Sequence, residues 1–226
     1  ESYIHKFLNK YGFSQIRTPL FENTNLFSRS IGLQTDIVSK EMYSWTDQGG
    51  NNLTLKPEVT ASVVRAYIQH NLGKKYPINK LYYIDTLFRR ERPQKGRYRQ
   101  FNQFGVEAIG SEHPEQDAEI IALAYNFYKS LNIENLTLKI NSIGSTDVRN
   151  QYKIALKEYL MPYKNKLSAL SQKRLETNPL RILDTKIDFE IEIINNAPHI
   201  IDFLNKEDKE HFSKVLSLLD SLSIKY

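Results

Sequence analysis

The stretch FRRERPQKGRYRQFNQFGVE, residues 88–107, decides the fold of this chain, because it joins two apolar segments through a strongly basic connection. The segment 81–88 before the connection is rich in Tyr, Ile, Thr, Leu and Phe, which favour β-strands. The segment 100–109 after it alternates between two faces, as a strand does. Pro93 and Gly96 interrupt both patterns. The sequence therefore predicts two strands joined by a loop.

One face of the second predicted strand is unusually polar. Gln103 and Glu107 flank Gly105, whose missing side chain leaves an open floor between them. The connecting loop carries six basic residues against the single acid Glu91: Arg89, Arg90, Arg92, Lys95, Arg97 and Arg99. Arginine has the planar, bidentate geometry that suits phosphate. The combination predicts a site for a small amine beside a polyphosphate. The alternative is an edge hairpin with a solvated basic loop.

Composition limits the function only loosely. The 226 residues fit one large domain or two smaller ones. The net charge of +5 favours an anionic partner such as a nucleotide or a nucleic acid. The absence of cysteine excludes disulfides, thiolate metal sites and a cysteine nucleophile, and it fits a reducing, cytoplasmic location. No apolar run reaches the roughly 18 residues that span a membrane, so no membrane partner is expected.

Hydrophobic periodicity places the remaining elements. Helices are expected at 1–11, 23–31, 57–73, 111–131, 145–159 and 208–222. Further strands are expected at 13–18, 42–46, 53–55 and 136–140, with a weaker strand signal at 187–193. The character of the chain changes from mixed to mostly helical between Asn141 and Thr146. We therefore predict an α+β fold, with an antiparallel sheet flanked by helices over residues 1–144 and a mostly helical domain over 145–226.

Two further features allow more than one interpretation. Glu58 follows Pro57 at a predicted helix start, where an acid is favourable beside the positive end of the helix dipole. The same carboxylate could instead receive a substrate ammonium group. The five histidines show no ligand spacing, so we predict surface or capping roles for them and no metal site.

The basic hairpin closely resembles the second signature motif of histidyl-tRNA synthetases, which are class II aminoacyl-tRNA synthetases. The similarity extends over the whole chain. Further stretches that resemble the family are EMYSW at 41–45, LTLKPEVTA at 53–61, INSIGS at 140–145 and TNPLRILDTK at 177–186. Pro19 resembles the proline of the first class II motif, which lies at the dimer interface in the family. The resemblance implies a class II catalytic domain with motifs 1 and 2, followed by the helical insertion domain.

The resemblance also implies an activity. In the family, ATP activates histidine to histidyl-adenylate, and the histidyl group is then transferred to tRNA(His). The implied ligands are histidine, tRNA(His), ATP and Mg²⁺, and the implied assembly is a homodimer formed around Pro19. The likeness assigns ATP binding to Arg89, Glu91, Arg97 and Phe101. It assigns histidine binding to Glu58, Thr60, Gln103 and Glu107. Arg89 is the implied catalytic residue, because it would hold both the α-phosphate and the substrate carboxylate.

Two departures from the family pattern matter. Val59 replaces the usual glycine after Glu58, while Thr60 is retained. The later histidine-specific motifs, the third class II motif and the anticodon-binding domain do not occur before Tyr226, so this chain alone is expected not to aminoacylate. One rival interpretation is the synthetase-like regulatory subunit of ATP phosphoribosyltransferase, which forms no histidyl-tRNA. The other is a fragment that binds RNA without chemistry, and its binding would weaken steeply with salt.

Overall fold

The computed structural model describes residues 1–31 and 41–226. Contacts within the chain divide it into two compact units, which we call the N-terminal unit, Glu1–Glu112, and the C-terminal unit, His113–Tyr226. This division falls earlier in the chain than Asn141–Thr146, where the sequence pattern changes from mixed to mostly helical. The reason is that the helix that follows Glu112 packs against the last helix of the chain. The predicted domains 1–144 and 145–226 remain a prediction.

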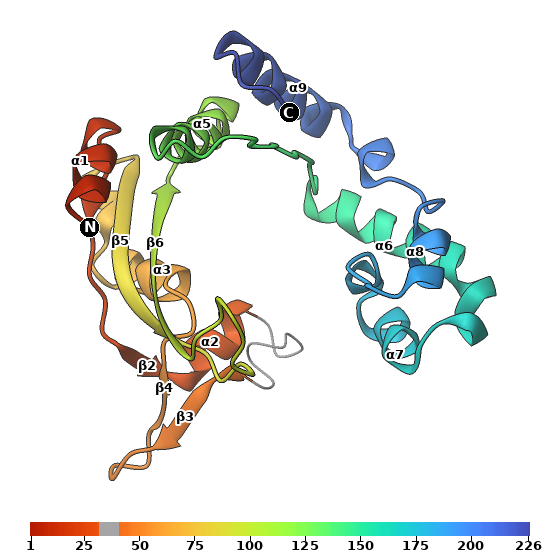
Figure 1. Ribbon diagram of the computed structural model, residues 1–226, viewed down its shortest axis with the longest axis horizontal. Coiled ribbons are helices and arrows are strands. Elements are labelled where there is room, and N and C mark those ends of the chain that lie inside the picture. Colours follow the sequence, from red (N-terminus) through yellow and green to blue (C-terminus); the bar gives the residue numbers. More distant parts are fainter. Residues whose placement is uncertain (32–40) are drawn as a thin grey trace. The chain divides into compact units, whose positions relative to one another are not determined.

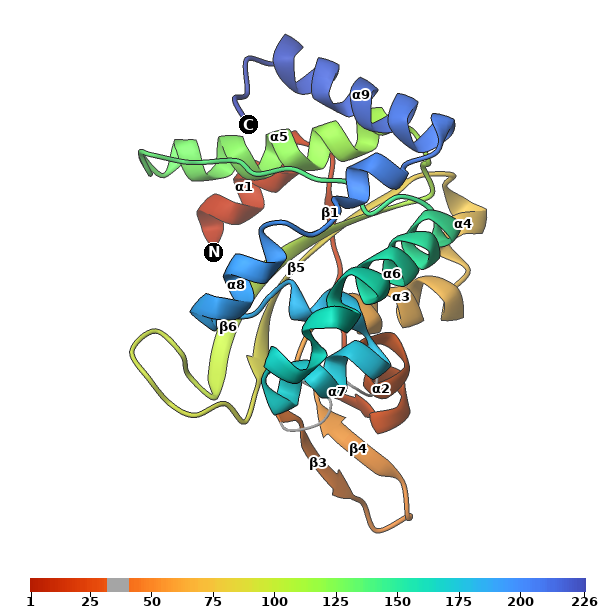
Figure 2. The same cartoon turned by 90° about the vertical axis from the view of Figure 1, so that its right-hand side faces the viewer.

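A long hairpin forms the centre of the N-terminal unit (Figure 1). Its strands β5 (Asn79–Phe88) and β6 (Gln100–Ile109) pair antiparallel along their whole length. The short strand β1 (Ser14–Gln15) joins the other edge of β5 in parallel, after helix α1 (Ser2–Lys10). The predicted hairpin is confirmed, and the loop between its strands extends beyond their ends (Figure 2). The expected strand at 13–18 is reduced to two residues.

A second sheet of three antiparallel strands completes the strands described in this unit. Its order is β2 (Phe21–Asn23), β4 (Asn52–Leu55) and β3 (Tyr43–Thr46). Helix α2 (Thr24–Ile31) follows β2 directly. The fully buried hydroxyl of Thr54 is hydrogen-bonded to the hydroxyl groups of Thr24 and Ser44, at 2.8 and 2.7 Å. These bonds satisfy a polar group that would otherwise be costly to bury.

Helix α3 (Thr60–Gln69) packs its apolar side on the hairpin, where Val59 and Val63 meet Leu87 in the core. The helix begins three residues later than the predicted start at Pro57. The carboxylate of Glu58 explains the difference, because it accepts the amide of Ala61 at 3.0 Å and so caps the first turn. The predicted continuation towards Gly73 is also interrupted. Left-handed backbone at Asn71 separates α3 from the short helix α4 (Leu72–Lys75).

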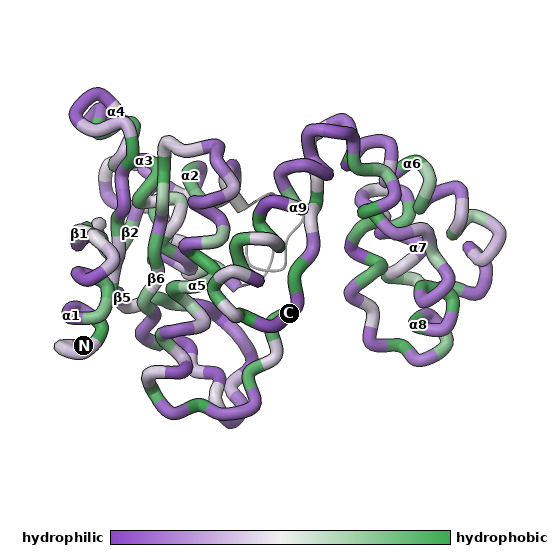
Figure 3. Tube along the Cα trace, turned by 90° about the horizontal axis from the view of Figure 1, so that it is seen from above, coloured by the Kyte–Doolittle hydropathy of each residue, from purple (hydrophilic) through white to green (hydrophobic). Residues whose placement is uncertain are grey.

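The C-terminal unit is helical throughout its described elements, and hydrophobic and hydrophilic residues alternate along its helices (Figure 3). Its elements are α5 (Pro114–Ser130), α6 (Thr146–Leu160), η2 (Met161–Lys166), α7 (Ala169–Thr177), η3 (Pro179–Ile182), α8 (Asp188–Ile194), η4 (Ile200–Phe203) and α9 (Lys206–Ser221). One apolar cluster joins α5 to α9, and a second joins α6 to α7 and η3. No helix in the described part of the chain is long and apolar enough to cross a membrane.

Two predicted strands of this unit are wrong. The segment 136–140 is extended, and Leu136, Leu138 and Ile140 alternate towards the interior as expected. However, Leu138 and Ile140 pack on helices α5 and α9, and no strand among the described residues pairs with this segment. Residues 188–193 of the second segment lie in helix α8 (Asp188–Ile194), whose Ile193 and Ile194 pack in the helical cluster. Tertiary packing therefore overrides strand propensity in both places.

Candidate active site

The pairing of β5 with β6 fixes which side chains share one face of the hairpin. Gly105 lies opposite Tyr83, Gln103 lies opposite Asp85, and Glu107 lies opposite Leu81. Because residues two apart on a strand point to the same side, the predicted residues Gln103 and Glu107 face the same side as Tyr83. The polar face inferred from the sequence therefore exists, and it includes residues of both strands.

The sequence predicts an open floor between Gln103 and Glu107, but the structure shows that this floor is covered. The ring of Tyr83 covers Gly105, and a Cβ atom added at Gly105 would collide with the Tyr83 hydroxyl and with its ring carbons. Tyr83 is only 4% exposed. Glycine is therefore required here for the close approach of a cross-strand aromatic ring. The sequence could not reveal this relationship, because it depends on the strand register.

Glu107 is held by the first residue of helix α3. The Thr60 hydroxyl donates to Glu107 Oε1 at 2.7 Å. Burial raises the pKa of Glu107, the nearby charge of Glu58 raises it further, and the Thr60 hydrogen bond lowers it in part. Glu58 and Glu107 therefore lie close enough to repel each other. A cation between them would relieve that repulsion.

Tyr83 joins this group electrostatically. Burial raises the pKa of its phenol, the charge of Glu107 raises it further, and hydrogen bonds with Thr60 and Gln103 lower it in part. The structure thus brings together all four predicted histidine-binding residues around Tyr83. They come from the α3 start (Glu58 and Thr60) and from β6 (Gln103 and Glu107). The sequence analysis did not identify Tyr83 as a member of this group.

Arg89, the first residue after β5, is held on two sides. Its Nε donates to the backbone oxygen of Pro57 at 2.8 Å, and its guanidinium carbon lies 5.2 Å from the centre of the Phe101 ring. Both contacts orient the planar cation. The bond through Nε leaves the two terminal nitrogens as the donors for an anion. The predicted ATP-binding residues Arg89 and Phe101 are therefore neighbours.

The remaining predicted residues lie in the loop between the strands. Arg97 Nη1 lies 3.3 Å from Glu91 Oε2, and the Arg97 side chain is 64% exposed. Because the Arg97 side chain is exposed, the pair contributes little to stability, so Arg97 can exchange it for a ligand at small cost. The Arg89 amide donates to the Arg99 oxygen at 2.9 Å, which closes the base of the loop. The structure brings together Glu91 and Arg97, both of which the family resemblance assigns to ATP binding.

The sequence analysis also missed a buried ion pair beside this face. Lys56 is fully buried, and its ammonium is paired with Asp85 on β5. Lysine is rarely buried, and its sequence context gives no sign of burial.

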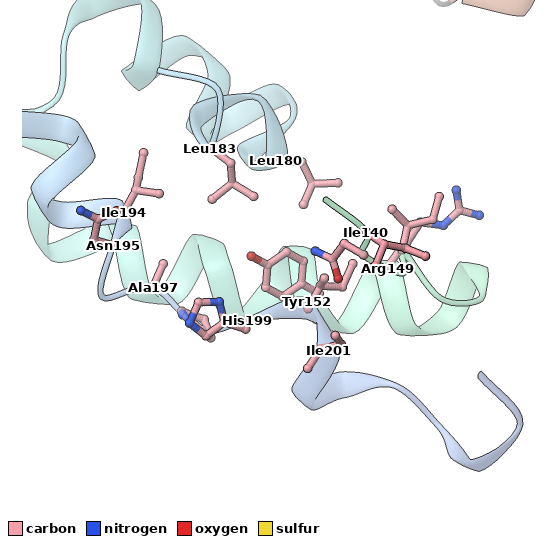
Figure 4. A pocket seen from close by; sticks show the side chains of 14 residues that line it. Ile140, Arg149, Tyr152, Leu180, Leu183, Ile194, Asn195, Ala197, His199 and Ile201 are labelled. Carbon is pink, nitrogen blue, oxygen red and sulfur yellow. The ribbon is translucent and has the colours of Figure 1, made fainter. Parts of the chain in front are cut away.

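A separate cavity of about 700 Å³ lies within the C-terminal unit (Figure 4). It is mostly apolar, and its more polar side chains are those of Asn141, Arg149, Tyr152, Asn195 and His199. None of the predicted site residues lines it. In the described part of the chain, no group of three or more His, Asp or Glu side chains could hold a metal ion. The predicted site residues therefore lie around the hairpin and not at this cavity.

Comparison with solved structures identifies the architecture. The chain aligns over its whole length with half of the apo Staphylococcus aureus histidyl-tRNA synthetase, at 39% identity and a TM-score of 0.76. A second structure, described as an ATP phosphoribosyltransferase regulatory subunit/histidyl-tRNA synthetase from Bacillus halodurans, covers 98% of this chain and 59% of its own, at 22% identity and a TM-score of 0.63. That second likeness concerns the fold alone. The predicted α+β fold of a class II aminoacyl-tRNA synthetase catalytic domain is thus confirmed.

Sequence comparison then identifies the family. The Histidyl-tRNA synthetase family profile matches residues 1–152. The chain is 51% identical over 226 residues to the histidine–tRNA ligase of Protochlamydia amoebophila, and 49% identical over 227 aligned residues to that of Staphylococcus epidermidis. This chain belongs to the histidyl-tRNA synthetase family, as the sequence motifs predicted. It covers 53% and 54% of those two relatives, so it spans about half of their length.

Proposed function

We propose that this chain supplies the histidine-activating and ATP-binding face of a histidine–tRNA ligase. The observation that carries the proposal is the joint placement of two carboxylates and a cation around one hairpin: Glu107 lies on β6, Glu58 precedes α3 beside it, and Arg89 follows β5. Glu58 and Glu107 lie close together beside the Thr60 hydroxyl, and Arg89 stands at the end of the adjacent strand. A substrate with an ammonium group and a carboxylate fits this separation of charges.

The histidine ammonium is proposed to lie between Glu58 and Glu107. Gln103 and the Thr60 hydroxyl supply further polar contacts, since both are within hydrogen-bonding reach of Tyr83 on the same face. A cation at this position would lower the raised pKa of Glu107 and keep it ionised. Tyr83 closes the floor of the pocket and limits its depth.

ATP is proposed to extend from Arg89 into the basic loop. Arg89 would contact the α-phosphate through its terminal nitrogens, while Phe101 would stack on adenine with the ring face that Arg89 does not cover. Glu91 would accept the adenine amino group, and Arg97 would hold the outer phosphates after their mutual ion pair opens. Glu91 and Arg97 would thus bind different parts of ATP, which is compatible with their contact in the structure without ATP.

The chemistry would proceed in two transfers. An oxygen of the histidine carboxylate attacks the α-phosphorus, the bond to the bridging oxygen breaks, and pyrophosphate leaves with that electron pair. A terminal hydroxyl of tRNA(His) then attacks the carbonyl carbon of the adenylate, its proton is released, and AMP leaves with the electron pair of the broken carbon–oxygen bond. Arg89 would neutralise the charge that develops on the α-phosphate, and the fixed ammonium site would align the carboxylate for attack.

Mg²⁺ is proposed to enter with ATP. The described residues contain no cluster of acidic or histidine side chains that could hold a metal, so the phosphate oxygens would supply its ligands. When bound, the ion would neutralise phosphate charge. We assign no step of the reaction to it.

A homodimer around Pro19 is also proposed. Three large apolar side chains of this sheet region are exposed: Leu20 at 49% and Phe21 at 48%, which follow Pro19, and Trp45 at 41% on β3, which β4 separates from β2. The rings of Phe21 and Trp45 are in edge contact, with centroids 5.8 Å apart. An exposed aromatic cluster of this kind is a candidate protein interface. A cytoplasmic location and tRNA(His) as a partner complete the proposal.

Histidine-dependent exchange of pyrophosphate into ATP tests the proposal directly. The assay uses a polypeptide that spans the whole length of the relatives, which we call the full-length enzyme. We expect exchange with histidine and with no other amino acid, and Arg89→Ala should reduce it by at least about a hundredfold. Arg92→Ala, an exposed arginine of the same loop, is the matched control and should retain activity within about threefold. A folded full-length enzyme without exchange would contradict the proposal and favour a regulatory role.

A further inference from the structure

Lys56 has an environment that a lysine rarely occupies. Its side chain is fully buried, and its ammonium is paired with Asp85. The same ammonium donates to the backbone oxygen and to the hydroxyl oxygen of Thr18, at 3.2 and 3.3 Å. These three acceptors match the three N–H donors of a lysine. Both oxygens of Asp85 have a partner, because the second oxygen accepts the amide of Thr86 at 2.9 Å.

Burying such a pair does not by itself stabilise a fold. The desolvation of two charges offsets most of their attraction, and an apolar pair of similar volume is often equally stable. A fully bonded pair does fix the relative positions of the segments that it joins. Here it joins the end of β4 to β5 and to residue 18, which immediately precedes Pro19.

The backbone around Lys56 leads directly to Arg89. The Lys56 amide donates to the Leu20 oxygen at 2.9 Å, and the Phe88 amide donates to the Lys56 oxygen at 3.1 Å. The next carbonyl, that of Pro57, accepts Nε of Arg89 at 2.8 Å. The side chain of Lys56 is fixed by Asp85. Lys56 therefore holds the adjacent Pro57 carbonyl in place, and that carbonyl orients the guanidinium of Arg89.

We propose that Lys56, paired with Asp85, is a positioning residue for Arg89. This inference rests on the proposed function, because it assigns Lys56 a part in the reaction through a residue that contacts ATP. The ion pair holds the Pro57 carbonyl, the carbonyl holds Nε, and the terminal nitrogens of Arg89 then point to a fixed place. Asp85 also lies opposite Gln103 on β6, so the same pair borders the histidine-binding face.

Steady-state exchange kinetics of the full-length enzyme provide the first test. Lys56→Met keeps the length of the side chain and removes its charge. We expect kcat to fall at least about tenfold with KM for histidine changed less than about threefold, because displacing a group that acts in the transition state reduces the rate more than binding. Lys56→Arg should restore kcat to within about threefold. Lys157→Met, which removes an exposed pair with Glu176, should have no effect.

A double variant tests whether the effect passes through Arg89. Lysine at position 89 cannot make the Nε contact, so Lys56→Met should lower kcat less than about threefold in an Arg89→Lys background. An equal loss in both backgrounds, or a lower melting temperature with unchanged kcat, would overturn the inference. If Lys56→Met does not fold, Asp85→Asn carries the same test, because it removes the opposite charge at nearly constant volume.

A measurement without catalysis separates this inference from the proposed function. Arginine side-chain ¹⁵N NMR follows solvent exchange of the Arg89 Nε–H, which Arg89→Lys identifies by loss of the signal. We expect Lys56→Met to accelerate this exchange at least about tenfold, because the Pro57 acceptor is released. If the rate of solvent exchange of the Arg89 Nε–H is unchanged in Lys56→Met, the inference is overturned, whether or not the enzyme is active. Absence of ATP–pyrophosphate exchange in the unaltered enzyme contradicts only the proposed function.

Discussion

Tyr83 on β5 lies directly opposite Gly105 on β6, and its ring occupies the space that any other residue at position 105 would fill. This cross-strand pair forms the floor between Gln103 and Glu107. The size of the proposed histidine pocket therefore depends on a residue without a side chain.

Gly105→Ala should displace the Tyr83 ring. The added methyl group would overlap the phenol, and overpacking of this kind costs about 1–3 kcal/mol of stability. We expect KM for histidine in the exchange assay to rise at least about tenfold, because the displaced ring enters the pocket. Gly49→Ala is the control, since its methyl group would meet only the ends of the flexible Asp47 and Asn51 side chains at a hairpin tip. Equal KM values for Gly105→Ala and the unaltered enzyme would contradict this account.

Thr60→Val should change the pH dependence of activity. The Thr60 hydroxyl lowers the pKa of Glu107, which burial and Glu58 raise. Without that donor, the pKa rises further, and a higher pH is needed to ionise Glu107. We expect the acid limb of the profile of kcat/KM for histidine to move to higher pH.

Thr60→Ser retains the donor and should keep the original acid limb. The loss of a hydrogen bond to a charged group should also reduce kcat/KM at neutral pH by about tenfold or more in Thr60→Val. An acid limb that is the same in both variants would show that Glu107 does not control it.

Glu107→Gln should stabilise the N-terminal unit at neutral pH. Burial raises the pKa of Glu107 in the folded state, so its contribution to stability is present below the unfolded pKa and is lost as pH rises through the folded pKa. Glutamine does not ionise and avoids that loss. We expect a higher melting temperature than the unaltered chain at pH 7 and a difference that shrinks towards pH 4.

The fluorescence of Trp45, which is the only tryptophan of the chain, reports this transition in the N-terminal unit. Glu158→Gln, an exposed substitution in the C-terminal unit, is the control and should leave the transition unchanged. The stabilised Glu107→Gln variant should also bind histidine poorly, which is the cost expected for a site that favours function over stability. A lower melting temperature at pH 7 would contradict the sign derived from the raised pKa.

Glu190→Gln should destabilise the C-terminal unit. Glu190 is fully buried and accepts the Ser168 amide at 2.7 Å, the Ser171 hydroxyl at 2.9 Å and the Thr185 hydroxyl. Burial raises its pKa, but these hydrogen bonds outweigh burial and hold the pKa below its usual value. An amide replaces one acceptor oxygen by a donor group, which faces donors already present. We expect a loss of about 2–4 kcal/mol, measured by chemical denaturation with far-ultraviolet circular dichroism.

The pH dependence gives this prediction a second check. Because the folded pKa of Glu190 is lowered, its contribution is present above the unfolded pKa and is lost as pH falls through the folded pKa. The stability difference between the unaltered chain and Glu190→Gln should therefore shrink in acid. Glu192→Gln, two residues away and exposed, should change stability by less than about 0.5 kcal/mol at any pH.

Local sequence determined much of the N-terminal unit. The alternation over residues 100–109 predicted both ends of β6 correctly, and Pro93 and Gly96 predicted the position of the loop. The family was also readable from the motif at 88–107, because ligand chemistry requires particular residue types at fixed spacing. The four proposed histidine-binding residues are the clearest case, since the structure brings all of them to one face.

Tertiary structure decided the features that depend on partners distant in the chain. The segments 136–140 and 187–193 have the residue pattern of strands, yet one packs on helices and the other forms α8, since packing against apolar neighbours outweighs local propensity. The Tyr83 ring over Gly105 required the strand register, and the buried Lys56–Asp85 pair required the approach of β4 to β5. The sequence by itself thus determined which residues we propose for the chemistry, because ligand binding of this kind needs these residue types. Only the tertiary structure decided what holds them in place, because burial and pairing arise from contacts between distant segments.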